Sequence, residues 1–170
     1  MFTNTTASNN TAVGEIALRL NTTGANNTAI GRGSLASNTT GSKVTALGVS
    51  ALHNNTTADN NVAIGCGALL TNTTGAENNA LGNSSLCANT EGNNNTALGH
   101  LALRANTTAS DNTAVGYSAL TANTTGTQNV AVGSGALDSN TTAGCNVGVG
   151  HGALADIQQA AVISLWEEML

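Results

Sequence analysis

The chain has 170 residues, of which 40% are hydrophobic, 2% aromatic and 8% charged, and it contains no proline. Because soluble domains normally carry ~25% charged residues, this composition leaves few groups for acid-base chemistry and argues against an ordinary enzyme. The net charge is -5, and the four Lys and Arg residues form no basic cluster, which disfavours nucleic-acid binding. No apolar run approaches the ~18 residues that a membrane span needs, so we expect no membrane insertion.

A strict internal repeat organises most of the sequence. Three features recur every 17 residues, nine times each and without an insertion: Gly from Gly14 to Gly150, Leu from Leu18 to Leu154, and Asn-Thr from Asn4 to Asn140. The chain therefore divides into an N-terminal lead-in (1–3), nine 17-residue repeats (4–156) and a C-terminal segment (157–170). We number the positions of each repeat from 1 at its first Asn, and call equivalent residues of successive repeats a column.

The repeat unit has few apolar columns. It is written N-T-T-[GA]-x-x-N-[TV]-A-[VIL]-G-x-x-[AS]-L-x-x, and all charged side chains of the repeats avoid columns 9, 10, 14 and 15. We expect these four columns to form the inner stack of a thin aliphatic core, and columns 5, 6, 12 and 16 to face solvent. The larger residues of this predicted core come from columns 10 and 15: Val13, Leu18, Ile30, Leu35, Leu47, Leu52, Ile64, Leu69, Leu81, Leu86, Leu98, Leu103, Val115, Leu120, Val132, Leu137, Val149 and Leu154.

The sequence of each repeat predicts a wide turn, followed by a strand and then a corner. In N-T-T-G-x-x-N the Asn and Thr side chains can bond nearby backbone groups, which is typical of turns. N-T-A-V-G has an aliphatic centre and ends at a Gly that can adopt positive φ, which predicts a short strand and a corner. The x-x-A-L-x-x segment suits a helical turn or a second strand, of which we expect the strand.

A unit this short cannot bury its apolar residues alone, so the units must stack and share one continuous core. Stacking at the ~4.8 Å spacing of neighbouring strands gives a rod roughly 40 Å long. The asparagines of columns 1 and 7 would then form ladders that hydrogen-bond from unit to unit, as stacked Asn does in cross-β arrays. The sequence therefore predicts an all-β fold, a parallel β-solenoid or β-roll of nine 17-residue coils.

The C-terminal segment differs from the repeats. Residues 157–170 contain no Gly and several apolar side chains. Asp156 can serve as an N-cap, with Gln159 three residues later resembling a capping box. We expect a short helix here that covers the last coil.

Two runs carry a resemblance to known repeat families: Asn112–Leu120 reads N-T-A-V-G-Y-S-A-L, and Asn27–Gly31 reads N-T-A-I-G. They resemble arrays in tail-fibre-like and surface-fibre proteins of phages, large viruses and bacteria. The A-[VIL]-G core also resembles the head repeats of trimeric autotransporter adhesins. The resemblance covers residues 4–156 and implies a left-handed parallel β-roll that forms a homotrimer and serves as a shaft or host-contacting surface.

The resemblance also implies the partners and the location. The partners would be further copies of the chain, in a trimer or an end-to-end filament, and a cell-surface glycan or receptor. A virion or an extracellular surface is the favoured location, although the first residues, Met1–Thr3, lack the basic and apolar regions of a signal peptide.

The chemistry-bearing residues do not gather into a site. The histidines His53, His100 and His151 never share a face on adjacent repeats. No combination of nucleophile, base and orienting group is visible, so we expect no enzymatic activity, cofactor or metal site. The cysteines are odd in number and lack metal-ligand spacing, which indicates free thiols: Cys66, Cys87 and Cys145.

The Asn-Thr-Thr triplets allow two interpretations. Either they are glycosylated, giving a sugar-coated rod, or they are turn residues that match the N-glycosylation sequon by accident. The lack of a signal peptide favours the second. The candidate glycosylation sites are Asn4, Asn21, Asn38, Asn55, Asn72, Asn106, Asn123 and Asn140.

Two functions remain for a rod of this kind. We favour a non-enzymatic structural fibre or surface-adhesion module. The alternative is an ice-binding solenoid, because regularly spaced Thr hydroxyls and methyls on a flat face could order water. Its best candidates are columns 2 and 3, for example Thr22 and Thr23, although adjacent residues of an extended chain point to opposite sides.

Overall fold

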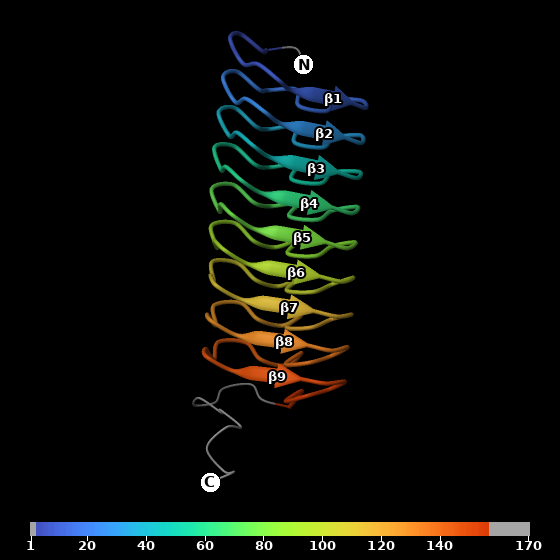
Figure 1. Cartoon of the computed structure of the whole chain (residues 1–170), viewed down its shortest axis with the longest axis vertical. Coiled ribbons are helices and arrows are strands. Elements are labelled where there is room, and N and C mark those ends of the chain that lie inside the picture. Colours follow the sequence, from blue (N-terminus) through green and yellow to red (C-terminus); the bar gives the residue numbers. More distant parts are fainter. Residues whose placement is uncertain (1–2, 157–170) are drawn as a thin grey trace.

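The computed structural model describes residues 3–156 and is a straight parallel β-solenoid (Figure 1). Each repeat forms one coil, and one three-residue strand of each coil joins a single nine-stranded parallel sheet in sequence order. The strands are β1 (Thr11–Val13), β2 (Thr28–Ile30), β3 (Thr45–Leu47), β4 (Val62–Ile64), β5 (Asn79–Leu81), β6 (Thr96–Leu98), β7 (Thr113–Val115), β8 (Val130–Val132) and β9 (Val147–Val149). The predicted fold class is confirmed, while the predicted helix at 157–170 and residues 1–2 of the lead-in lie outside the described residues.

The strands pair in perfect register. Ala29 lies opposite Ala46, and Ile30 lies opposite Leu47, so each residue meets the residue 17 positions later in the sequence. A register this uniform follows from a repeat without insertions, since any change in length would shift every later strand. The sheet therefore stacks identical columns along the rod.

Backbone hydrogen bonds between coils continue well beyond the strands. In the third coil, the N–H of Gly48 donates to the Ile30 carbonyl oxygen (2.8 Å), and the N–H of Leu52 donates to the Ala68 carbonyl oxygen (3.0 Å). Buried backbone groups need such partners, and here the neighbouring coils provide them. Stacking is therefore what allows so short a repeat to adopt a defined structure.

Each coil has one strand instead of the two that we expected. The segment at positions 12–17 is a series of turns. All nine leucines of column 15 have positive φ, between 48° and 55°, whereas a β-strand needs φ near −120°. The left-handed conformation is uncommon for a residue with a side chain. In this fold it directs each leucine inward, and the burial of that side chain offsets the conformational cost.

The core is a thin stack of Ala, Leu and Ser side chains. The leucines of column 15 are fully buried from Leu18 to Leu137, and Leu154 at the end of the rod is half-buried. The small residues of columns 9 and 14 pack beside them, for example Ala80 and Ser85. With alanine on one side and leucine on the other, the coil can be narrow without aromatic residues.

The predicted placement of column 10 in the core is wrong. Side chains of successive strand residues point to opposite sides of a sheet. Because the alanine of column 9 points inward, its neighbours in columns 8 and 10 must point outward. The outward-pointing residues of column 10 are Val13, Ile30, Leu47, Ile64, Leu81, Leu98, Val115, Val132 and Val149, with exposures up to 68% at Val149.

Two buried asparagine ladders run along the interior, as the sequence predicted. In column 1, the Asn38 side-chain amide donates to Asn21 Oδ1 (2.8 Å) and to the Gly41 carbonyl oxygen of its own turn (2.9 Å). In column 7, Asn78 Nδ2 donates to the Gly92 carbonyl oxygen of the next coil (2.8 Å). Each asparagine thus links neighbouring coils and holds the wide turn closed.

The corner after each strand requires glycine, as the strand and corner prediction implied. Gly82 has φ +141°, and a Cβ placed on it would lie 2.4 Å from the carbonyl oxygen of Gly99 in the next coil. No other residue fits this close approach of two backbones. The strict recurrence of Gly in column 11 therefore has a steric cause.

Candidate functional surface

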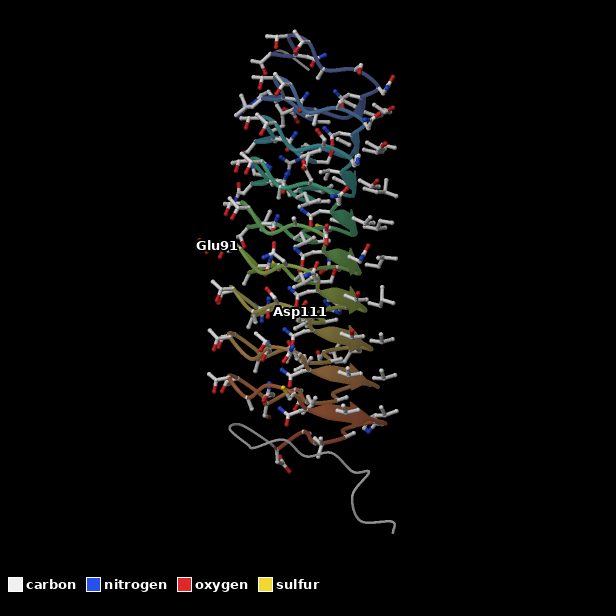
Figure 2. All side chains as sticks on the ribbon, turned by 60° about the vertical axis from the view of Figure 1, so that its left-hand side comes forward. Glu91 and Asp111 are labelled. Atoms are coloured by element: carbon white, nitrogen blue, oxygen red, sulfur yellow. The ribbon has the colours of Figure 1, made fainter. Side chains whose placement is uncertain are left out.

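The main exposed feature of the rod is the outer side of its sheet, which we call the strand face and define as columns 8 and 10. Each coil contributes two outward side chains: a Val, Ile or Leu from column 10, and a residue from column 8 that is usually Thr or Val. Neither column contains a charged residue. Figure 2 shows this row of side chains projecting away from the rod on the strand side.

Many aliphatic side chains of the strand face are well exposed. Val13 is 57% exposed, Leu47 42% and Leu81 38%. Single exposed aliphatic residues are ordinary, but a contiguous apolar patch of several hundred Å² commonly marks an interaction site. Here the aliphatic column continues through all nine strands in register, so the patch is as long as the sheet.

Columns of mostly polar residues border the strand face on both sides along the chain, with the exposed Val49 in column 12 as an exception. Column 6 precedes it and includes Lys43, Glu77 and Asp111, all of which are exposed. Column 12 follows the corner glycine, and its neighbouring members His100 and Tyr117 make an edge-to-face ring contact with 5.7 Å between centroids. An apolar strip with a polar border is the usual anatomy of a protein interface.

The opposite edge of the rod, at the wide turns, offers only one free column of threonines. The column 2 hydroxyls are already used, since Thr22 Oγ1 donates to the Thr39 carbonyl oxygen (2.9 Å) and Thr73 Oγ1 to that of Thr90 (3.0 Å). Column 3 is exposed along the rod, as at Thr23, but Glu91 interrupts it. Figure 2 places Glu91 at the margin of the rod away from the strands.

The structure argues against glycosylation at most of the candidate sequons. Asn4 is exposed, but the side chains of the other seven have no exposed surface. Each of those Nδ2 atoms uses its two hydrogens on the Oδ1 of the preceding asparagine and on the turn carbonyl, as at Asn38, and a sugar would replace one of these hydrogens. The seven buried sites are Asn21, Asn38, Asn55, Asn72, Asn106, Asn123 and Asn140.

The histidines lie apart in the structure. His53 Nδ1 lies 2.9 Å from the Gly33 carbonyl oxygen, His100 contacts Tyr117, and His151 is exposed near the C-terminal end of the rod. Among residues 3–156, no group of three or more His, Cys, Asp or Glu side chains is placed to hold a metal ion.

The cysteines are free thiols in three different columns. Cys66 and Cys145 are exposed and Cys87 is half-buried. Burial raises the pKa of the Cys87 thiol, and the Arg104 guanidinium offsets part of that rise. A thiol with a raised pKa is less often the reactive thiolate, so Cys87 has no feature of an activated nucleophile.

No family model, no curated protein and no solved structure matches the chain. Within residues 3–156, no helix has the length and apolarity needed to cross a bilayer. The resemblance to fibre arrays and adhesin heads therefore stays a hypothesis based on the repeat motif.

Proposed function

We propose that the chain is a non-enzymatic structural fibre or surface-adhesion module, a stiff rod that associates side by side with further copies through its strand face. The observation that carries this proposal is the exposed aliphatic column 10, from Val13 to Val149. Water contact with such a strip costs roughly 25 cal/mol per Å² of apolar surface. Covering it would therefore stabilise an assembly.

The size of the strand face favours an assembly of more than two copies. At ~4.8 Å per strand and ~3.3 Å per residue, the face measures about 40 Å by 10 Å. Two such faces would bury roughly 800 Å² in total, less than the ~1,200 Å² that stable pairs usually bury. A homotrimer, as the adhesin resemblance implies, would bring the three faces to a common axis and add contacts from the flanking columns.

The test places lysines on the strand face and measures the mass in solution. Light scattering of the unmodified chain should give a multiple of 16.7 kDa. The variant Leu47→Lys, Leu81→Lys, Val115→Lys should lose the mass that lateral association adds, because each charge would have to be buried in the interface. These side chains point outward, so circular dichroism should show an intact fold.

The matched control carries the same charges in the same three coils at the opposite edge: Thr40→Lys, Thr74→Lys and Thr108→Lys. It should retain the mass of the unmodified chain. A monomeric unmodified chain, or a strand-face variant that keeps the full mass of the unmodified chain, would reject lateral association.

The ice-binding alternative is supported by the regularity of the threonines. Column 8 places Thr beside the aliphatic column 10 on the strand face, for example at Thr28 and Thr45, and column 3 adds a second row at the wide turns. This function predicts a dispersed monomer that inhibits ice recrystallisation. Loss of that inhibition in the strand-face variant would place ice binding on the strand face, and loss in the wide-turn control would place it on column 3. Either result would establish ice binding in place of the fibre.

A further inference from the structure

The two asparagine ladders end in unsatisfied acceptors at the C-terminal end of the rod. Within the ladders each Oδ1 accepts from the following coil: Asn123 Oδ1 from the side chain of Asn140 (3.0 Å), and Asn129 Oδ1 from the N–H of Asn146 (3.0 Å). In the last coil, Asn140 Oδ1 and Asn146 Oδ1 are buried without a hydrogen-bond partner. Buried side-chain acceptors are normally paired, because neither water nor protein otherwise replaces the lost hydration.

The N-terminal end of the rod presents the complementary donors. The groups equivalent to the donors above are Asn4 Nδ2 and the backbone N–H of Asn10. The Oδ1 atoms of both residues already accept from the second coil, Asn4 from Asn21 (3.4 Å) and Asn10 from the N–H of Asn27 (2.9 Å). Their donors thus face the side from which a preceding coil would approach, and Asn4 is exposed.

We propose that the rods stack head to tail, with the first coil of a second copy seated on the last coil of the first, in the place where the sequence predicts a helix at 157–170. The strictly constant repeat makes coil 1 equivalent to the coil that would follow coil 9. Stacking would pair β9 with β1 of the second copy and continue both asparagine ladders across the junction. It would also cover the open sheet edges that strands at the end of a solenoid expose.

The charges at the junction are compatible with this stacking. Neighbours in column 12 touch, as the ring contact between His100 and Tyr117 demonstrates. At a junction, His151 of one copy would meet Glu15 of the second copy, which gives an imidazole and a carboxylate in contact. Within one chain these two exposed residues lie at opposite ends of the rod, about 38 Å apart at the strand spacing.

This separation allows a charge-swap experiment in which only a contact between copies can matter. Electron microscopy of the full chain should show rods whose lengths are multiples of about 40 Å. His151→Glu should shift the distribution to single rods, because it places two carboxylates at each junction. Adding Glu15→Lys in the same chain should restore the long rods. Single rods in the unmodified chain would overturn the proposal, and so would rods of the double variant that are no longer than the rods of His151→Glu.

A second pair of variants tests the ladder itself. Val44 occupies column 7 in the third coil, so valine is compatible with the fold at this position. Asn146→Val removes an acceptor from the junction and should weaken end-to-end association about fivefold, the effect of one hydrogen bond. The control, Asn129→Val, breaks the same ladder inside the rod and should lower the thermal midpoint while leaving the rod lengths unchanged. Equal rod lengths for Asn146→Val and the unmodified chain would contradict a role for the ladder.

The stacking proposal rests on the proposed fibre function, but it involves the two ends of the rod and not the strand face. All variants are therefore also measured in the strand-face lysine background. In that background the rods should lose lateral mass and keep their length. Long rods of single-chain width in the unmodified chain would reject only side-by-side assembly, and lateral assemblies of single-rod length would reject only stacking.

Discussion

At the scale of single residues, two leucines five positions apart in one coil have opposite environments. Leu86 is fully buried and Leu81 is 38% exposed on the strand face. We expect Leu86→Ala to lower the free energy of unfolding by about 2 to 5 kcal/mol, because it leaves a cavity in the narrow core. Leu81→Ala should lower the free energy of unfolding by less than about 1 kcal/mol, because it leaves no cavity in the core. Chemical denaturation in a background that carries only Leu47→Lys and Val115→Lys, which keeps Leu81 and opposes lateral assembly, measures both, and equal losses would contradict the inward assignment of column 15.

The sequence alone could not separate these two residues, because both columns are invariably aliphatic. The burial of column 15 depends on the left-handed backbone at Leu86 (φ 49°), which is atypical of leucine and leaves no sign in the repeat. The exposure of column 10, in contrast, can be predicted from the sequence. The alanine of column 9 and the period of two in a strand exclude an inward position for both of its neighbours, so placing columns 9 and 10 together in the core conflicts with the strand that the same residues predict.

At the scale of the repeating elements, the asparagine ladders link the coils in addition to the short strands. Column 7 has one exception, Val44, which is buried and offers no Oδ1 to the N–H of Asn61. Elsewhere in the column this bond forms, as from the N–H of Asn78 to Asn61 Oδ1 (2.9 Å). The ladder is thus interrupted once near the N-terminal third of the rod.

Filling this gap should stabilise the rod. In Val44→Asn, Oδ1 can accept from the N–H of Asn61, and Nδ2 can donate to the Ala58 carbonyl oxygen. We expect the free energy of unfolding to rise by about 1 kcal/mol, the net effect of a buried hydrogen bond. The control Val62→Asn lies on the strand face, where Asn79 already occurs one coil later, and should be neutral. A loss of stability in Val44→Asn, measured by thermal unfolding, would show that the ladder does not need this amide.

The same elements explain what the repeat pattern predicts well and what it obscures. The register, the corner at Gly82 and the ladders follow from a constant period and from the side-chain chemistry of Asn. The sequon interpretation competed with the ladder for the same Asn-Thr-Thr triplets, and only the burial of residues such as Asn72 separates the two. The exposed face is harder to predict from the sequence. Columns 8 and 10 can be assigned to the outside of the sheet only when the number of strands in each coil is known.

At the scale of the whole molecule, the rod is close to one-dimensional, since strands contact only their neighbours in the sheet. In such a fold, stability approximates a sum over coils and their interfaces. A whole coil should therefore be removable at almost any point, provided that the deletion equals one period. A deletion one residue shorter should fail, because it alters the alternation of the strand at the joint.

Deleting Leu81–Ala97 removes 17 residues and joins Ala80 to Leu98, which restores the motif at the joint. We expect this variant to fold with a thermal midpoint within a few degrees of the full chain, and to be shorter by ~4.8 Å in small-angle scattering. Deleting Leu81–Thr96 joins Ala80 to Ala97 and leaves one extra residue in the strand. That insertion turns the following aliphatic residue, Leu98, inward against the column 15 leucines that remain, such as Leu69 and Leu103, so the free energy of unfolding should fall by about 3 kcal/mol or more. Equal stability of the two deletions would mean that neighbouring coils tolerate a change of register, and that the constant period of the sequence is not what keeps the rod straight.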